Sequence, residues 1–368
     1  MIETPALVDQ HCHGVLRTEL GLGTFEARLA PTEGPSAPGT TLFDTQTGFA
    51  VRRWCPPLLG LEPHSPPARY LARRRELGVL ESTRRLLRGT GITTYLVDTG
   101  PPGDLTCPAE LASAADAEAR ETVRLELLAE QIADTSGTVA SFLANLAESV
   151  HAAAAHAVAF TSVAGLRHGL ALAPEPPGPG EVRGAAGRWL AGRRAGDALT
   201  DPVLLRHLLW NAVASGLPLQ LHTGPGGPGA RVDGTDPVPL TGFVRATAGL
   251  GTDLILLHGS PYHRRAARLA AVFPHVYADC GAALPRTGSG AARVLAEILE
   301  LAPFGKVLFS TGAGALPELH VVGARLFREA LGRVLGGWVT EGSWSPGDAH
   351  RVAALIAAGN ARRVYGLD

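Results

Sequence analysis

The sequence predicts an α/β fold, a distorted (β/α)8 barrel, and two observations support this prediction. Eight short apolar runs bounded by turn residues alternate with longer segments of helical periodicity, which is the pattern of repeated βα units. The chain has 368 residues, of which 45% are hydrophobic, and this is enough for one closed barrel with a large core. We therefore expect residues 1–368 to form a single domain.

The apolar runs place the elements in order. The expected strands lie at 6–11, 93–98, 122–127, 157–163, 217–222, 253–258, 275–280 and 306–311. The third strand is open to a second interpretation, since its apolar residues could equally continue as a helix. The expected helices lie at 68–88, 139–157, 202–215, 262–272, 291–302, 318–335 and 347–358. Helix starts carry a chemical signal, as where Asp201 precedes Pro202 as an N-cap and a first-turn proline.

A long insertion, residues 14–67, follows the first strand. It is rich in proline and glycine at 31–39 and 56–67. Loops of this length in compact domains are usually functional covers or disordered segments. We expect this insertion to form a partial lid over the mouth of the barrel.

Composition argues against partners that bind through charge. Lys and Arg total 33 against 34 Asp and Glu, so no surplus of positive charge favours nucleic acid or an anionic membrane. The four cysteines show no CxxC spacing, and the chain shows neither a secretory leader nor an apolar run of membrane-spanning length. We expect a cytoplasmic protein with reduced thiols that acts on a small molecule, and assembly into a homo-oligomer stays open.

Histidines fall at the carboxyl ends of several expected strands, where a barrel of this type builds its active site. His11 and His13 end the first strand, His222 ends the fifth and His258 ends the sixth. Period-two alternation points His11 and His13 to one side and turns Cys12 away from them. Four imidazoles suit zinc or another borderline divalent metal. A polar turn is the alternative interpretation of the HxH pair taken alone.

Seven segments carry a family resemblance that spans nearly the whole chain outside the insertion. They are VDQHCHGV, ITTYLVDTG, LRHGL, LPLQLHTGPG, LILLHGSPYHRRAARLAAVFPHVYADCG, LFSTGAGALPELHVVGARLFREAL and NARRVYG. Together they resemble the amidohydrolase superfamily, and most closely the amidohydrolase-type domain of FluG-like proteins. The resemblance implies that His11, His13 and His222 hold one divalent metal, zinc or else manganese or iron. His258 matches the sixth-strand histidine of the family.

Two positions depart from the family pattern. Thr161 stands where the family usually has a fourth-strand lysine, and Gly312 stands where it usually has an eighth-strand aspartate. The single lysine of the chain, Lys306, begins its strand at the opposite end, so a site bridged by a carboxylated lysine is excluded. Glycine can neither bind a metal nor accept a proton. Either another carboxylate substitutes, or the hydrolytic chemistry is lost or altered.

Three carboxylates are candidates for this substitution. Glu126 resembles the glutamate of the family's RxE segment and is our first choice as a catalytic residue beside His258. Asp98 and Asp279 are predicted to contact substrate, with hydrogen bonding to loop amides as an equally open interpretation. Arg167 is predicted to clamp a substrate carboxylate in bidentate fashion, with a structural ion pair as the alternative.

The leading functional hypothesis is a metal-dependent hydrolase of a C–N bond, an amide or γ-glutamyl-type amide of a small acidic molecule, as the resemblance implies. The first alternative is a diverged biosynthetic enzyme without metal, a lyase, isomerase or condensing enzyme that uses the same histidines as acid and base. Thr161 and Gly312 motivate it. The second alternative is a catalytically inactive ligand-binding protein on the same fold.

Overall fold

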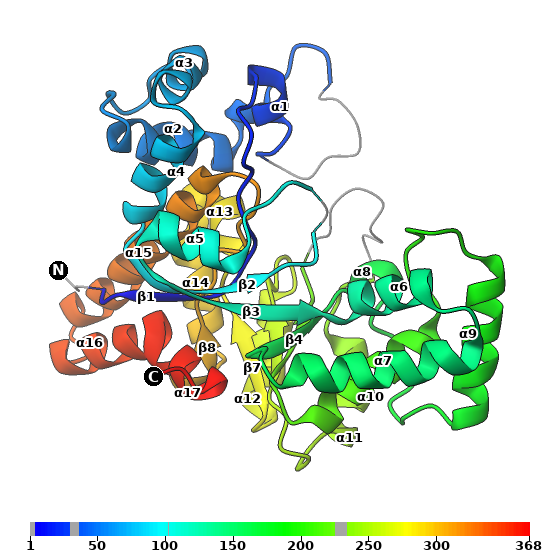
Figure 1. The fold of residues 1–368 in the computed structure, drawn as a ribbon. Coiled ribbons are helices and arrows are strands. Elements are labelled where there is room, and N and C mark those ends of the chain that lie inside the picture. The colour runs from blue at the N-terminus through cyan, green and yellow to red at the C-terminus, as the bar shows by residue number, and fades with distance from the viewer. Residues whose placement is uncertain (1–3, 30–36, 102, 225–233) are drawn as a thin grey trace.

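The eight expected strands are present and form one parallel sheet in chain order (Figure 1). This computed structural model describes residues 4–29, 37–101, 103–224 and 234–368. The strands are β1 Leu7–Cys12, β2 Ile92–Asp98, β3 Glu118–Arg124, β4 Ala159–Ser162, β5 Leu219–His222, β6 Leu254–Leu257, β7 Val276–Asp279 and β8 Val307–Leu308. Backbone bonds from Gln10 N to Phe309 O and from Gly312 N to His11 O join the β8 segment to β1. The predicted (β/α)8 barrel is therefore confirmed.

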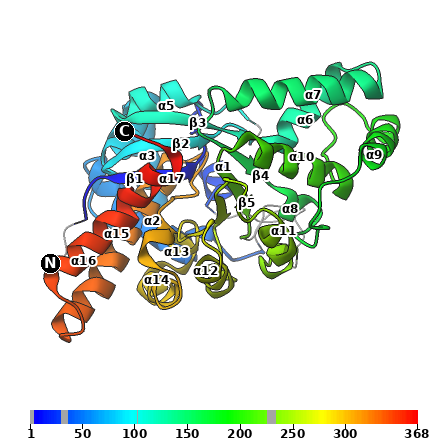
Figure 2. The ribbon, with the colours of Figure 1, turned by 90° about the horizontal axis from the view of Figure 1, so that it is seen from below.

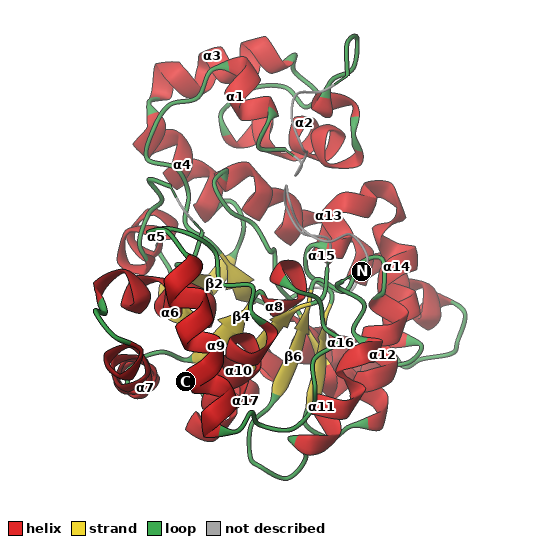
Figure 3. Ribbon diagram, turned by 90° about the vertical axis from the view of Figure 1, so that its right-hand side faces the viewer, coloured by secondary structure: helices red, strands yellow, loops and turns green. Residues whose placement is uncertain are grey.

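Helices surround the sheet (Figure 3). They are α1 Leu22–Glu26, α2 Gln46–Leu58, α3 Pro67–Leu77, α4 Val79–Arg88, α5 Pro108–Ala115, α6 Leu125–Thr135, α7 Val139–Ala154, α8 Ala164–Arg167, α9 Pro179–Gly192, α10 Pro202–Ser215, α11 Thr241–Ala246, α12 His263–Val272, α13 Ala283–Thr287, α14 Ala291–Leu299, α15 Pro317–Thr340, α16 Pro346–Ala354 and α17 Asn360–Tyr365. Seen from below, α7 and α9 lie on the flank opposite α14 and α16 (Figure 2). No helix within the described ranges combines the length and the apolar composition needed to cross a membrane.

Several element boundaries differ from the prediction, and two of these differences have a clear physical cause. The third strand covers Glu118–Arg124 and not 122–127, because the chain turns helical at Leu125. Its polar sequence, EARETVR, forms a strand through parallel pairing with β2 and β4, which a local pattern does not reveal. The expected helix at 68–88 is split at Gly78, whose φ of +78° ends α3.

The last helix of the chain closes the amino end of the barrel. Asn360 Nδ2 donates to the carbonyl oxygens of Phe304 and Val307, at the start of β8, over 2.8 Å each. Ala361 and Tyr365 of α17 then pack into the interior of the barrel. Their apolar neighbours there include Val8, Leu96, Ala159, Ile255, Leu257, Tyr277 and Leu308. The C-terminus is therefore part of the barrel core.

The described part of the insertion is helical and packs on the barrel. Helices α1 and α2 share a buried cluster with α3, α4 and the first half of α15, and its members include Phe25, Phe43, Val51, Cys55, Leu59, Tyr70, Leu86, Val321 and Val322. Thr47 Oγ1 donates to Pro285 O in the segment after β7. Figures 1 and 3 show α1, α2 and α3 together on one side of the barrel. That the insertion acts as a lid stays a prediction.

Candidate metal centre

Four imidazoles gather at the carboxyl end of the barrel. His11 is the second-last residue of β1 and His13 directly follows this strand, while His222 ends β5 and His258 directly follows β6. The ring centroid of His11 lies 5.1 Å from that of His13, 5.0 Å from that of His222 and 5.3 Å from that of His258. The ligand nitrogens of His11, His222 and His258 all lie within 4.8 Å of one another. The structure thus brings together the four histidines that the sequence singles out.

Hydrogen bonds to the far side of two rings set their orientation. His11 Nδ1 lies 2.9 Å from Gln220 Oε1, and the amide of Gln220 is fixed because its Nε2 donates to Gln10 O over 2.7 Å. An amide oxygen can only accept, so His11 Nδ1 carries the proton and His11 Nε2 keeps a free lone pair. His13 Nδ1 makes the equivalent bond to Asp98 O over 3.0 Å. Both rings are therefore prepared to bind a cation through Nε2.

Burial keeps these imidazoles neutral. It lowers the pKa of His11 to about 3, with the neighbouring His13 acting in the same direction. Burial, together with nearby imidazoles, also holds the pKa of His222 and of His258 well below the ordinary value. Neutral imidazole is the form that binds metal ions.

Unpaired nitrogens show that the site fits a metal ion. His11 Nε2, His222 Nε2 and His258 Nδ1 are buried and have no hydrogen-bond partner within the described part of the chain. Each unpaired buried polar atom costs about 1–3 kcal/mol. A divalent cation bound by His11 and His222 would satisfy two of these nitrogens and would lie beside the third, that of His258. Imidazole suits zinc, iron or a similar metal.

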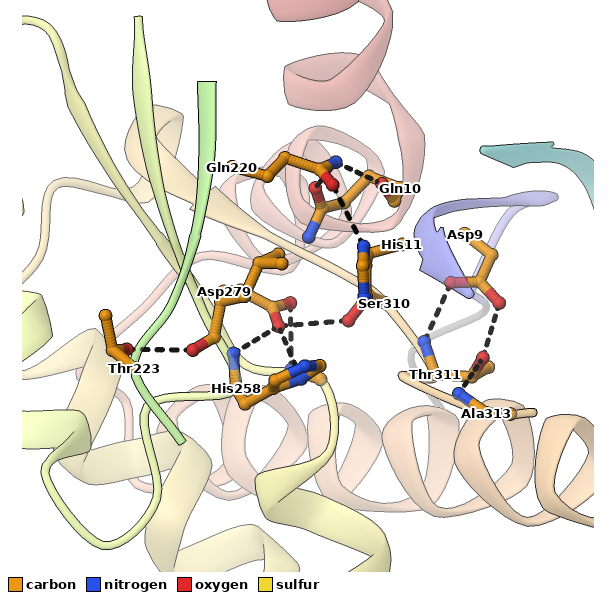
Figure 4. Close-up of polar contacts among 12 residues, drawn as sticks. Asp9, Gln10, His11, Gln220, Thr223, His258, Asp279, Ser310, Thr311 and Ala313 are labelled. Carbon is orange, nitrogen blue, oxygen red and sulfur yellow. Dashed lines mark hydrogen bonds and ion pairs between the residues drawn. The ribbon is translucent and has the colours of Figure 1, made fainter. Parts of the chain in front are cut away.

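His258 adopts a strained backbone conformation that places its ring against Gly312. Its φ is +67°, and its N–H donates to Asp279 Oδ2 over 2.9 Å (Figure 4). A Cβ built on Gly312 would lie 3.0 Å from His258 Cε1 and 3.2 Å from His258 Nδ1. The imidazole of His258 therefore takes the space beside residue 312 that a side chain would need.

Asp279 is bonded to protein groups on both oxygens. Its Oδ1 accepts from Gly281 N over 2.9 Å, and its Oδ2 accepts from Ser310 Oγ over 3.0 Å besides the His258 amide. Burial raises the pKa of Asp279 to about 6. Asp279 Oδ2 also lies 3.9 Å from His258 Nδ1. These contacts match the loop-amide interpretation, and direct contact with substrate stays a prediction.

Asp98 is held by Arg124, a residue that the sequence interpretation missed. Arg124 Nη2 donates to Asp98 Oδ2 over 2.5 Å, and Gly100 N donates to Asp98 Oδ1 over 2.8 Å. Burial alone would raise the pKa of Asp98, but the charge of Arg124 outweighs this effect and lowers the pKa. Asp98 Oδ2 lies 3.7 Å from His13 Nδ1, so this carboxylate supports His13. The sequence pattern did not identify Arg124 because its partner, Asp98, lies on the neighbouring strand.

The other two predicted residues, Glu126 and Arg167, make their polar contacts with groups other than the four histidines. Glu126 is in the first turn of α6, where its Oε1 accepts from Ser162 Oγ over 2.5 Å and from Val163 N over 3.0 Å. Arg167 Nη2 lies 3.4 Å from Glu130 Oε1, which is the ion pair considered as the alternative. Within the described residues neither side chain makes a hydrogen bond or ion pair with the four histidines.

Comparison with known proteins agrees with the barrel fold. The fold and site define a (β/α)8 protein with a candidate metal centre at the carboxyl ends of its strands. Residues 85–367 match the sequence profile of the Amidohydrolase family, to which the chain belongs.

The chain is also similar to individual proteins. The protein fluG of Emericella nidulans is 36% identical over 153 residues, which are 41% of this chain and 18% of fluG. The match thus spans less than a fifth of that relative. A protein of Lactobacillus casei ATCC 334, provisionally assigned as a metal-dependent hydrolase, superposes with a TM-score of 0.86 at 25% identity over 99% of this chain and 96% of its own. A uronate isomerase of Thermotoga maritima shares the fold, with a TM-score of 0.63, 14% identity and coverage of 98% and 94%.

Proposed function

We propose that the chain is a metal-dependent hydrolase of a C–N bond, an amide or γ-glutamyl-type amide of a small acidic molecule. The observation that supports it most is the convergence of three buried, unpartnered imidazole nitrogens, those of His11, His222 and His258, in a protein of the Amidohydrolase family. The likeness to the L. casei protein supports the hydrolase class.

Under this proposal His11, His13 and His222 would hold one divalent ion, with zinc first and manganese or iron as alternatives. The ion would supply Lewis acidity, which polarises a carbonyl group and lowers the pKa of a water molecule. Gln220 and the Asp98 carbonyl orient His11 and His13 through their Nδ1 protons. These supporting contacts keep the free nitrogens directed at one point.

His258 and Asp279 are the chain's own groups for moving a proton. His258 Nδ1 is unpartnered at the mouth, and Asp279 holds the His258 backbone while its Oδ2 lies 3.9 Å from that ring. This pair occupies the region where the family would place its eighth-strand aspartate. Asp279 therefore joins Glu126 as a candidate for the substitute carboxylate, and His258 would stabilise developing charge on the substrate oxygen.

A second candidate function is an acid–base enzyme without metal, such as an isomerase or lyase. Two residues favour it: Thr161 replaces the lysine expected from the family, and Gly312 leaves the metal region without its aspartate. The His258 and Asp279 pair would serve this chemistry as well. The two functions differ in whether thorough chelation abolishes turnover.

Metal analysis of the untagged chain tests the proposal. The wild type, His222→Ala and the exposed control His156→Ala are assayed for bound zinc, manganese and iron, and for hydrolysis of a panel of N-acyl and γ-glutamyl amides. We expect His222→Ala to lose both metal and turnover by more than about a hundredfold, since removal of a ligand exceeds the usual effect of its supporting residues. His156→Ala should behave as wild type. Turnover that persists in metal-free protein would reject the proposal and favour the second function.

A further inference from the structure

A second group of metal-ligand side chains lies on the outer side of β1, away from the barrel interior. Asp9, Cys12 and His320 offer a carboxylate oxygen, a thiol sulfur and an imidazole nitrogen that all lie within 4.8 Å of one another. All three residues have 0% exposure. Figure 4 shows Asp9 directed toward Thr311, on the other side of His11 from Asp279 and His258.

The backbone of β1 is shaped so that Asp9 and Cys12 share this outer side. Residues three apart point to opposite faces of a regular strand. The pairing of β1 with β2 shifts register between Asp9 and Cys12, and this irregularity brings both side chains outward. His320 faces them from the first turn of α15. The group is therefore assembled by the irregularity of β1 and by the first turn of α15.

His320 lacks the partners that a buried imidazole needs. Neither Nδ1 nor Nε2 has a hydrogen-bond partner within the described residues, although the side chain is fully buried. Asp9 is anchored on one side, since it accepts from Thr311 N over 2.8 Å and from Thr311 Oγ1 over 2.5 Å. Asp9 Oδ2 nevertheless lies 3.8 Å from His320 Nδ1. Cys12 Sγ donates to Leu96 O over 3.6 Å and also faces Asp9.

We propose that Asp9, Cys12 and His320 bind a second divalent ion, zinc by ligand type, in a buried three-ligand site independent of the barrel histidines. Thiolate, imidazole and carboxylate are the ligands that zinc takes in proteins. Two ligand atoms at about 2.1 Å from a tetrahedral ion are about 3.4 Å apart, close to the separation of Asp9 Oδ2 and His320 Nδ1. The thiol of Cys12 would give up its proton to solvent when its sulfur binds the ion.

Such an ion would join three elements that support the mouth. Asp9 belongs to β1, His320 to α15, and Thr311 links Asp9 to the segment after β8. That segment continues into Gly312, against which His258 packs. The ion would therefore fix β8 and α15 to β1 on the outer side without touching substrate.

Cobalt spectroscopy tests this site, because the barrel centre contains no sulfur. The full chain is produced in medium with cobalt in place of zinc, so that the ion is present while the chain folds. We expect a near-ultraviolet thiolate-to-cobalt charge-transfer band in the wild type. The band should vanish in Cys12→Ser and persist in His222→Ala. Cys107→Ser, which removes the exposed cysteine, is the matched thiol control and should keep the band.

A second variant, His320→Gln, keeps the test valid if Cys12→Ser does not fold. In His320→Gln the band should also vanish, while circular dichroism stays that of the wild type and the metal content falls by one ion per chain. Absence of the band in folded, cobalt-grown wild type would overturn the proposal, as would a band lost in Cys107→Ser but kept in Cys12→Ser. The barrel centre is tested separately by His222→Ala, so either proposal can fail alone.

Discussion

His258 shows how one residue's conformation determines what its neighbours can be. Its positive φ turns the chain sharply after β6 and is stabilised by the bond from its amide to Asp279. The ring is thereby directed against Gly312, which itself has a φ of +57°. A side chain at position 312 would therefore crowd the imidazole of His258 and would itself be strained at this positive φ.

Gly312→Ala should destabilise the protein by about 1–2 kcal/mol or more, because a Cβ is strained at this φ and also meets the ring of His258. Urea unfolding measures the change. Gly332→Ala is the control, since this glycine lies within α15 with nothing in the space its Cβ would occupy, and it should stabilise by about 0.5–1 kcal/mol. Equal stability of Gly312→Ala and wild type would contradict the packing of His258 on Gly312.

Glu126→Gln should alter how stability depends on pH. Burial raises the pKa of Glu126 above that in the unfolded chain. The folded state then holds the proton more tightly, so this contribution to stability is complete below the unfolded pKa and is lost as pH rises through the folded pKa. The free energy of unfolding, measured from acid to neutral pH, should increase for Glu126→Gln relative to the wild type as pH rises. Glu148→Gln, an exposed control on α7, should give a curve parallel to wild type.

At the scale of elements, the insertion depends on helix packing. Helices as short as α1 and α3 are marginal alone in water and need tertiary contacts. Phe25 is fully buried between Phe43, with ring centroids 6.0 Å apart, and Tyr70, at 6.2 Å. The insertion is therefore attached to the barrel through this aromatic cluster and through α15.

Phe25→Ala should cost about 3–5 kcal/mol of stability because it leaves a cavity in this cluster. Limited proteolysis should show faster cleavage within 14–67 than in wild type. Phe49→Ala removes a ring of the same size that is 49% exposed on α2, and should stay within about 0.5 kcal/mol of wild type. If the insertion acts as a lid, Phe25→Ala will also lower turnover, whereas unchanged turnover would argue against that role.

The elements that the sequence predicts are those whose patterns are local. His11, His222 and His258 could be placed because each follows a short apolar run, and parallel strands bring such ends together. The third strand was placed too late because its polar residues become a strand only through their neighbours. Gln220 was overlooked although it lies two residues before His222 on the same face of β5, so period-two alternation could have found it. The partner of Arg124 lies on β2 and could not be derived locally.

At the scale of the whole molecule, a polar chain links the C-terminus to the candidate metal centre. Tyr365 in α17 donates its hydroxyl proton to Gln10 Oε1 over 2.5 Å and accepts from Gln220 Nε2 over 2.9 Å. Gln220 in turn accepts the proton of His11 Nδ1. The helix that closes the amino end of the barrel therefore helps to orient a ligand at the opposite end, because buried networks of this kind act as units.

Tyr365→Phe should weaken metal binding as well as the fold. Loss of the hydroxyl leaves the amides of Gln10 and Gln220 short of a partner, which should cost about 1–3 kcal/mol of stability. It also removes one of the bonds that hold the Gln220 amide toward His11 and leaves those to Gln10. Zinc affinity should therefore fall by up to about tenfold, as when a supporting partner of a ligand is weakened. Competition with a chromogenic chelator measures the affinity, with Tyr262→Phe at the start of α12 as control. A fall in stability with unchanged zinc affinity would show that Tyr365 serves the barrel core alone, whereas a fall in both would show that α17 supports His11 through Gln220.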